Sequence, residues 1–420
     1  MFNCTPLKAS HNPLNISLIV AITPFSLQAK GPRHSRRRRA AGLMWAGIAA
    51  VLMALSGCAV TDAQATVNSP CPPDVVLSSQ TSIVAATATS AENRPTLPAS
   101  VVAALRAEGD RSDTACVAVL SPTGQLAAFP LTPRREDGEV EQESRRSELL
   151  EANIKAVDEA VGHLAATNEG LDLRGLLATA LAAHPEPTTL YLLSSGVSTV
   201  QPVDLRTIGW NTDGRTLGTW LVDRQWIRPM PGWTVRFLGL GRTAGTQPPL
   251  PDPLRERLIA IWVGVCQSLH ATRCEASPEP VPAEPPAATK VVPPVALPKP
   301  EPFGSSLLLP EPALFRIGSA ELQPGADGTL GVVVQQAADR GLTLQVIGHT
   351  DAVTGTPATN LLLSRQRAEA VRHRLIELGL QPGRITTAQG VGSATANAEA
   401  ERRDLRQIDR DRNVEIRWNS

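Results

Sequence analysis

The sequence predicts a mixed α/β protein with two folded domains: a doubly wound α/β domain at residues 58–275 and a smaller α+β domain at residues 313–420. At 420 residues the chain is long enough for two domains and their tails. In both regions short apolar runs alternate with segments of helical periodicity, which is typical of sheets covered by helices. Between them, residues 276–312 are rich in Pro, which is typical of a linker.

The composition excludes some classes of partner. Lys plus Arg and Asp plus Glu number 40 each, so the chain has no net charge that would attract nucleic acid or an acidic membrane surface. Aromatic residues are only 3% of the chain, and no basic stripe is interleaved with aromatic side chains, the pattern that nucleic-acid readers need. We therefore expect no nucleic-acid partner.

The N-terminus has the features of an export signal. Arg36–Arg39 form a basic cluster, an apolar run follows from Ala40 to Gly57, and Leu55-Ser56-Gly57-Cys58 ends it. These last four residues resemble the bacterial lipobox. The resemblance implies removal of residues 1–57, attachment of lipid to the Cys58 sulfur, and a mature protein anchored to a membrane of the cell envelope. The alternative is a plain transmembrane anchor, although the run is slightly shorter than the roughly 20 residues of a membrane span.

Cysteine usage fits an exported protein. Besides Cys58 the mature chain would keep Cys71, Cys116, Cys266 and Cys274. Four cysteines in an oxidising compartment suggest two disulfides. Three pairings are possible, of which we favour Cys71 with Cys116 and Cys266 with Cys274. No Cys-x-x-Cys occurs in the sequence, so no zinc site is expected.

Strands and helices are expected to alternate in the first domain. Ala115–Leu120 has Val at alternate positions and ends in the turn Ser121-Pro122-Thr123-Gly124, which predicts a buried strand. Asp172 is placed to cap a helix that ends before Pro185. The expected order is a strand at 115–120, helices at 150–164 and 172–183, strands at 190–193 and 235–240, and a helix at 254–269.

The segment Thr189–Thr199 gives this domain a resemblance to a degenerate von Willebrand factor A-like domain, because it lies where that family has an Asp-Gly strand end. The family's metal site also needs Asp-x-Ser-x-Ser after the first strand, to give a hard cation its oxygen ligands. Here Leu120–Gly124 contains no carboxylate, and Ser194-Ser195-Gly196 lacks the Asp. The resemblance therefore implies a surface for a protein partner of the envelope, without a bound metal.

The Pro-rich segment 276–312 is expected to be an extended polyproline II spacer. Such a helix rises about 3.1 Å per residue, so the segment would reach roughly 100 Å at most. That length suits a tether that reaches from a membrane towards the wall. A passive spacer is the plainer interpretation.

The second domain is expected to have the order βαβαββ. Gly341 and Gly379 lie just past its two helices, where a left-handed C-terminal residue favours Gly. The expected elements are a strand at 314–317, a helix at 326–340, a strand at 343–348, a helix at 361–378, and strands at 384–389 and 414–418.

Several motifs occur together in this second domain. In chain order they are Phe315–Leu322, Gly348–Asp351, Asn360, Leu363–Ala368 and Asp411–Ile416. In this combination, residues 314–420 resemble the OmpA-like peptidoglycan-binding domain of outer-membrane proteins and lipoprotein anchors. Two positions differ from the family's pattern, since Arg316 replaces an acidic residue and Asn413 replaces a second Arg.

The resemblance implies that Asp351 and Arg367 bind the ligand. In the family, these positions bind the zwitterionic end of a diaminopimelate residue in the peptidoglycan stem peptide. A guanidinium matches a carboxylate with two parallel hydrogen bonds, and a carboxylate accepts from an ammonium group. Thr350, Asn360 and Arg412 are further candidates for ligand contact. The structural alternatives are an ion pair between Asp351 and Arg367, closure of the strand end by Thr350, a helix cap at Asn360, and a surface salt bridge at Arg412.

We expect a lipoprotein that binds peptidoglycan noncovalently and links the membrane to the wall, with no enzymatic activity, cofactor or metal. Ser194-Ser195-Gly196 lacks the preceding Gly of a nucleophile elbow. Gly239-Leu240-Gly241 lacks the spacing of a dinucleotide-binding loop. Two alternatives stay open: a wall hydrolase that uses the second domain for targeting, and an adhesion or assembly module that acts mainly through the first domain.

Overall fold

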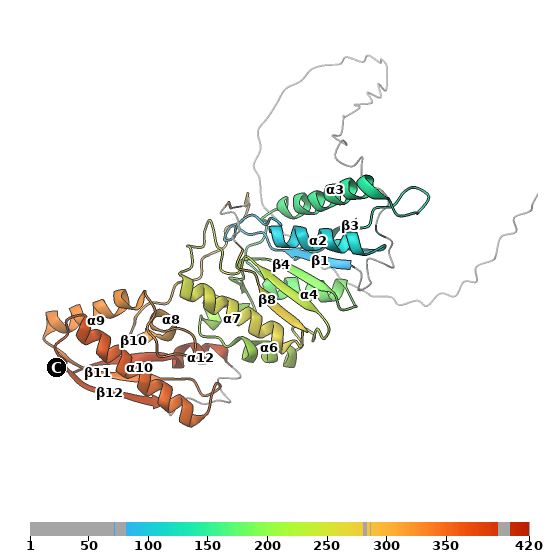
Figure 1. Cartoon of the computed structure of the whole chain (residues 1–420). Helices are drawn as coiled ribbons and strands as arrows, with labels where there is room; N and C mark the ends of the chain where they lie inside the picture. The colour runs from blue at the N-terminus through green and yellow to red at the C-terminus, as the bar shows by residue number, and fades with distance from the viewer. Residues whose placement is uncertain (1–70, 72–80, 280–283, 286, 394–403, 420) are drawn as a thin grey trace, which may run out of the picture. The chain divides into compact units, whose positions relative to one another are not determined.

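The computed structural model describes Cys71 and residues 81–279, 284–285, 287–393 and 404–419 (Figure 1). The predicted signal and the lipobox with Cys58 lie outside these ranges. Among the helices within them, none combines the length and apolar character that crossing a membrane requires. The described residues form two large sheets, the first with a hydrophobic core on each face and the second with one core.

The first sheet has six strands in the order β3-β2-β1-β4-β7-β8. They are β1 (Thr81–Ala86), β2 (Cys116–Ser121), β3 (Gly124–Pro130), β4 (Thr189–Leu193), β7 (Thr234–Leu238) and β8 (Arg273–Ala276). Neighbours are parallel except β2 and β3, which are antiparallel. The strand expected at 115–120 is β2. The central strand β1 was not predicted, because Ile83 and Val84 are its only large apolar residues and its Thr, Ser and Ala neighbours carry a weak strand signal.

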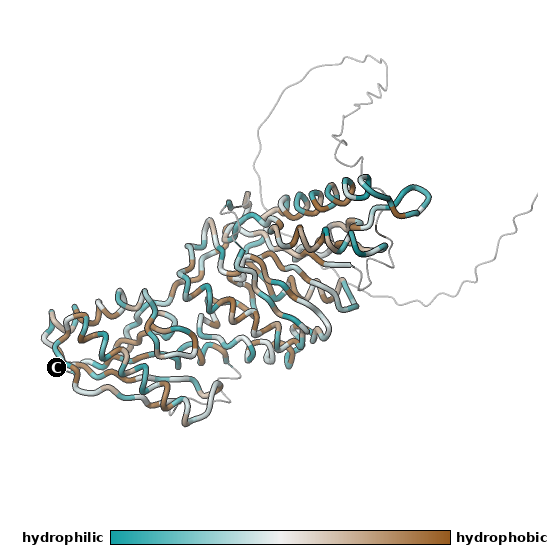
Figure 2. The backbone as a smooth tube through the Cα atoms, in the orientation of Figure 1, coloured by the Kyte–Doolittle hydropathy of each residue, from teal (hydrophilic) through white to brown (hydrophobic). Residues whose placement is uncertain are grey.

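Helices cover both faces of this sheet, as a doubly wound fold requires. One face is covered by α2 (Ala99–Arg111) and α3 (Glu143–Gly162), and the other by α4 (Leu173–Ala183), α6 (Gly214–Asp223) and α7 (Asp252–Ser268). Alternate residues of β1 supply the two cores: Val84 and Ala86 pack with the first pair, and Ile83 and Ala85 with the other three. In Figure 2, α3 alternates between hydrophilic and hydrophobic colours along its length, as expected for a helix with one buried face.

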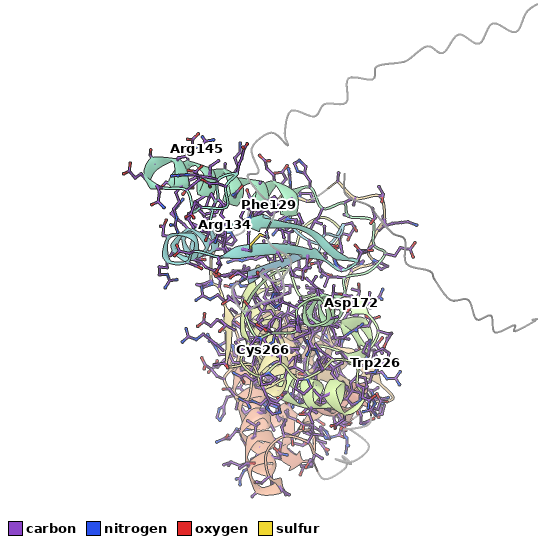
Figure 3. All side chains as sticks on the ribbon, turned by 90° about the vertical axis from the view of Figure 1, so that its right-hand side faces the viewer. Phe129, Arg134, Arg145, Asp172, Trp226 and Cys266 are labelled. Atoms are coloured by element: carbon purple, nitrogen blue, oxygen red, sulfur yellow. A yellow bond between two sulfur atoms is a disulfide. The ribbon has the colours of Figure 1, made fainter. Side chains whose placement is uncertain are left out.

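The helix cap and the disulfide pairing expected for this domain are both present. Asp172 caps α4, and its carboxylate accepts a hydrogen bond from the Gly175 N–H at 2.6 Å (Figure 3). The structure has disulfides between Cys71 and Cys116 and between Cys266 and Cys274. The second joins α7 to β8, the neighbouring edge strand. The small elements β5 (Thr199–Val200), β6 (Val203–Asp204) and α5 (Leu205–Ile208) follow β4.

A fully buried carboxyl group, that of Glu92, lies at the carboxyl ends of β1 and β4. Thr87 Oγ1 and Thr89 Oγ1 donate hydrogen bonds to it at 2.7 and 3.0 Å. Ser194 Oγ and the Ser195 N–H donate at 2.9 and 2.8 Å. Burial raises the pKa of Glu92, and these four hydrogen bonds oppose the rise only in part.

The strand expected at 115–120 is therefore not the first strand of this sheet, because β1 precedes it. Leu120–Gly124 covers the end of β2, the turn after it and the first residue of β3, whereas the loop after β1 begins at Thr87 and contains Glu92. This carboxyl group already accepts from four protein donors. Within the described ranges there is no group of three or more His, Cys, Asp or Glu side chains that could hold a metal ion.

Glu92→Gln is expected to stabilise the protein relative to wild type, increasingly so as pH rises. A raised carboxyl pKa means that the folded state binds the proton more tightly, so wild-type stability falls as pH rises from the ordinary carboxyl pKa through the raised one. Gln does not titrate, so the stability of the Glu92→Gln protein does not have this pH dependence. Urea unfolding of both proteins at several pH values measures the difference, and a gap that does not change with pH would contradict the prediction. As a contrast, Glu92→Ala should destabilise, because it leaves buried donors unpaired.

Within the predicted linker 276–312, residues 287–312 do not form a free extended spacer. Val292 and Val295 are buried. Val295 N–H donates to Gln247 Oε1 at 2.8 Å, and Gln247 Nε2 donates to the Val295 carbonyl at 3.2 Å. The Val residues between the prolines therefore anchor this segment on the first domain, an effect that Pro content alone does not reveal.

The second sheet has five strands in the order β12-β11-β13-β10-β9. They are β9 (Glu301–Phe303), β10 (Ser306–Pro310), β11 (Thr343–His349), β12 (Ile385–Gly392) and β13 (Asn413–Asn419). Only β11 and β12 are parallel, and α10 (Pro357–Glu377) connects them. The core of this sheet contains residues of α9 (Ala326–Arg340) and α10. The short elements are α8 (Glu311–Leu314), η1 (Pro382–Arg384) and α12 (Leu405–Asp411).

The strand expected at 314–317 does not exist. Glu311–Leu314 form one helical turn instead, with Pro312 in the first turn, where its missing N–H costs nothing. β13 pairs with β11 on one side and with β10 on the other, and β10 lies inside the predicted linker. The sheet therefore begins before residue 313, and its order is not βαβαββ.

A glycine lets α10 approach the sheet closely, which positions the candidate site. A Cβ atom added to Gly348, at the end of β11, would lie 2.1 Å from the Ser364 carbonyl oxygen on α10. Backbone can approach backbone here only because Gly has no side chain. Arg367 lies one helical turn further along α10, so this contact sets its distance from the Asp351 loop.

Candidate functional site

Asp351 is held inside the loop that follows β11. Its Oδ1 accepts hydrogen bonds from the backbone N–H groups of Val353 and Thr354 at 2.8 and 2.7 Å. The Thr354 hydroxyl donates to Oδ2 at 2.8 Å. Asp351 is 2% exposed, so the residue closes the loop as well as carrying a charge.

Arg412 is the charged partner of Asp351. Its Nε lies 2.5 Å from Asp351 Oδ2, and its Nη2 donates to Thr354 Oγ1 at 3.0 Å. A third bond runs from Nη1 to the carbonyl of Asn211 in the first domain, at 2.7 Å. Burial acts to raise the pKa of Asp351, but Arg412 and the hydrogen bonds from Thr354 outweigh it and hold that pKa below its usual value.

Arg367, on α10, pairs with Glu311 rather than with Asp351. Its Nη1 lies 3.0 Å from Glu311 Oε2, and its Nε donates to the Ser319 carbonyl at 3.0 Å. The guanidinium also lies over the ring of Phe315, 5.3 Å from its centre. Arg367 is 2% exposed. The structural alternative for these two residues, an ion pair between Asp351 and Arg367, is therefore not formed, because each has another partner.

Glu311 has a second cationic partner, Arg257 of α7, and neither residue was predicted to belong to the site. Both terminal nitrogens of Arg257 lie 3.4 Å from Glu311 Oε1. Burial acts to raise the pKa of Glu311, but Arg367, Arg257 and Arg412 together lower it to about 2. Glu311 is thus ionised at every pH at which the protein would work.

Asn360 and Thr350 have separate roles in the structure. Asn360 Nδ2 donates to the carbonyls of Asp351 and Thr354 at 3.0 and 2.8 Å, so it orders the loop. It does not cap the helix, since Thr356 is the N-cap of α10. Thr350 N–H donates to the Gly392 carbonyl at 3.0 Å, which closes the strand end. Its buried hydroxyl has no hydrogen-bond partner among the described residues.

Thr350 is one of the residues that line a hollow of about 420 Å³ on the second domain. Other lining residues include His349, Asp411, Asn413 and Glu415. Asp351 and Arg367 do not line this hollow. Thr350 is therefore adjacent to the site in sequence but faces a different space.

Taken together, two carboxylates and three guanidiniums form one buried network, because Asn211 links its two ion clusters: the Asn211 carbonyl accepts from Arg412 Nη1, and Asn211 Oδ1 accepts from Arg257 Nη1. Asp351 and Glu311 are the anions, and Arg367, Arg412 and Arg257 are the cations. Asp351 and Arg367 belong to the same network but do not touch. Arg367 contacts the Glu311 carboxylate, and Asp351 contacts the Arg412 guanidinium. Each therefore already pairs with a group of the same charge as the one that a zwitterionic ligand would bring.

Known proteins resemble the C-terminal domain. The model of the OmpA family matches residues 314–409. Outer membrane protein A of Bordetella avium is 33% identical over 119 residues, 28% of this chain and 59% of that protein. The probable lipoprotein YiaD of Escherichia coli is 38% identical over 99 residues, 23% of this chain and 44% of that protein. The chain thus spans less than two thirds of each relative.

Among solved structures, the crystal structure of the peptidoglycan-associated lipoprotein from Burkholderia pseudomallei aligns with 26% of this chain and 88% of that chain. The sequence identity is 24% and the TM-score is 0.21.

Proposed function

We propose that this chain, which carries an OmpA-family domain at its C-terminus, is an envelope lipoprotein that binds peptidoglycan noncovalently and links a membrane to the wall. The observation that carries the proposal is that the matched segment contains Asp351 and Arg367 in one buried network of charges. The lipid would be attached at Cys58. The name of the E. coli relative, a probable lipoprotein, supports this anchor.

The ligand would be the diaminopimelate end of a stem peptide. Arg367 would bind its carboxylate with two parallel hydrogen bonds, and Asp351 would accept from its ammonium group. Asn360 would keep Asp351 in position through the loop carbonyls. Two fixed charges of opposite sign disfavour a ligand that lacks either group, because a buried partner would be left unpaired. No covalent bond forms or breaks.

The first domain would bind a protein partner of the envelope, as a von Willebrand factor A-like domain without metal. Its doubly wound sheet, with β1 and β4 at the centre, is consistent with this role. The carboxyl ends of these strands hold Glu92, whose oxygens are taken by hydroxyl and N–H donors. A partner would therefore be recognised by surface complementarity, without a shared cation.

The full chain is expected to sediment with insoluble peptidoglycan of the diaminopimelate type and much less with the lysine type. Lysine ends in an ammonium group alone, so Arg367 would lose its carboxylate. Losing a hydrogen-bonded charged contact costs about 1.5–3 kcal/mol, or roughly tenfold or more in affinity. Tubes without peptidoglycan give the background. Equal sedimentation with both types, or with neither, would contradict the proposed ligand.

A further inference from the structure

Each of the two proposed recognition groups has an internal partner with the charge that the ligand would supply. Glu311 presents a carboxylate to Arg367 at 3.0 Å, and Arg412 presents a guanidinium to Asp351 at 2.5 Å. Arg367 and Asp351 are each 2% exposed. A stem peptide could reach neither group unless the internal partners moved.

Glu311 is placed to compete with a ligand carboxylate for Arg367. It lies in α8, just before the residues that match the family model. Its Oε2 accepts a hydrogen bond from Arg367 Nη1, and its Oε1 accepts one from Arg257 Nη1. Glu311 therefore bridges the second domain and the first. A ligand carboxylate approaching Arg367 would need the position that this side chain occupies.

Polar residues of the first domain hold the partners in place. Arg257 Nη1 and Nη2 contact Glu311 at 3.4 Å. The carbonyl of Asn211 accepts from Arg412 at 2.7 Å, and the Asn211 N–H donates to Asp409 of α12 at 3.0 Å. Every one of these contacts joins residues far apart in the sequence, so they form only when the two domains are together.

Apolar contacts add to this interface. Leu405 and Ile408 of α12 belong to the same hydrophobic cluster as Leu205 and Ile208 of α5. The rest of the interface described above consists of ionised and amide groups. Such groups regain water when the domains separate, so a buried ion network contributes little net stability. An interface of this kind can hold a closed form and still open.

We propose that the structure is a closed form of the chain, in which Glu311 occupies the carboxylate position on Arg367 and the first domain, through Arg257 and Asn211, keeps it there. Peptidoglycan binds the open form, after Glu311 leaves. This inference rests on the proposed function. The apparent dissociation constant equals the intrinsic one divided by the open fraction, so whatever weakens the interface tightens binding.

The test is sedimentation of the full chain with insoluble peptidoglycan of the diaminopimelate type. Arg257→Gln removes the charge that holds Glu311 without touching Asp351 or Arg367. If about a tenth of the wild-type chain is open, the variant's apparent dissociation constant should fall by up to about tenfold, the limit for a fully open variant. Arg255→Gln is the matched control on the same helix, because Arg255 pairs with Asp252 and not with the second domain.

Asn211→Ala provides a second variant, in case Arg257→Gln does not fold. It removes the side-chain contacts to Asp409 and Arg257 and leaves Glu311 intact. An independent readout is hydrogen exchange at the Asn211 N–H, which Asp409 protects in the closed form. Exchange at this amide should speed up when soluble peptidoglycan fragments are added.

The outcomes separate this inference from the proposed function. Tighter binding by the folded interface variants, with Arg255→Gln unchanged, supports the closed form. If the wild type sediments but neither folded interface variant binds more tightly, the closed form is wrong and the proposed function stands. If the wild type and all variants fail to sediment, the proposed function is wrong and this inference falls with it.

Discussion

Replacing Arg367 with Ala is expected to abolish sedimentation of the full chain with insoluble peptidoglycan. The guanidinium is the proposed carboxylate-binding group, and truncating one partner of a buried, hydrogen-bonded charge pair costs about 2–5 kcal/mol. That is a loss of about thirtyfold or more in affinity. The substitution also removes the contacts to Glu311, Ser319 and the Phe315 ring, so some loss of stability is expected too.

Two further variants distinguish lost recognition from lost folding. Arg367→Lys keeps the positive charge but cannot form the two-pronged bond, so it should weaken binding while the fold is retained. Arg365→Ala changes an exposed residue on the same helix and should bind like wild type. Thermal unfolding of each variant checks the fold. Undiminished sedimentation by a folded Arg367→Ala protein would refute the proposed site.

Replacing Gly348 with Ala is expected to destabilise the second domain severely. The new Cβ atom would lie 2.1 Å from the Ser364 carbonyl oxygen, and the neighbour is backbone, which cannot turn aside as a side chain can. Overpacking a core typically costs 1–3 kcal/mol, and we expect about 3 kcal/mol or more here. Because α10 must move away from β11, Arg367 moves with it and peptidoglycan binding should also be lost.

Gly331→Ala is the matched control for Gly348→Ala. Gly331 lies in α9, and a Cβ atom added there meets nothing within 4 Å. Ala in place of a partly exposed helical Gly with free space around it should stabilise by about 0.5–1 kcal/mol. Urea unfolding measures both effects. Similar stability of Gly348→Ala and wild type would mean that the close approach of α10 and β11 does not constrain the domain.

The sequence predicted those elements whose signals are local. The helix expected at 361–378 is α10, which begins four residues earlier at Pro357, and the strand expected at 343–348 is β11. Caps and helical periodicity are contained in neighbouring residues, so they can be read without the fold. By contrast, β1 is a central strand because β2 and β4 pair with it. Such pairing between distant segments cannot be predicted from the residues next to β1 in the sequence.

The sequence identified the residues of the candidate site that lie in family motifs, but not the residues that pair with them. Asp351 and Arg367 could be named because they lie in motifs of a resemblance. Glu311 and Arg257 could not, since each is an ordinary charged residue that becomes buried only through contacts more than 50 positions away. For Arg412 the sequence left ligand contact and a surface salt bridge open. Its side chain is only 12% exposed and contacts Asp351.

The β9–β10 hairpin has a consequence for anyone who trims this protein to its recognisable C-terminal portion. A fragment beginning at residue 314 would lack β10, so β13 would become an unpaired edge strand. Its free backbone N–H and C=O groups would pair with other copies and promote aggregation. It would also lack Glu311. Such a fragment would report on a fold and an affinity that the intact molecule does not have, so trimming should start upstream of Glu301.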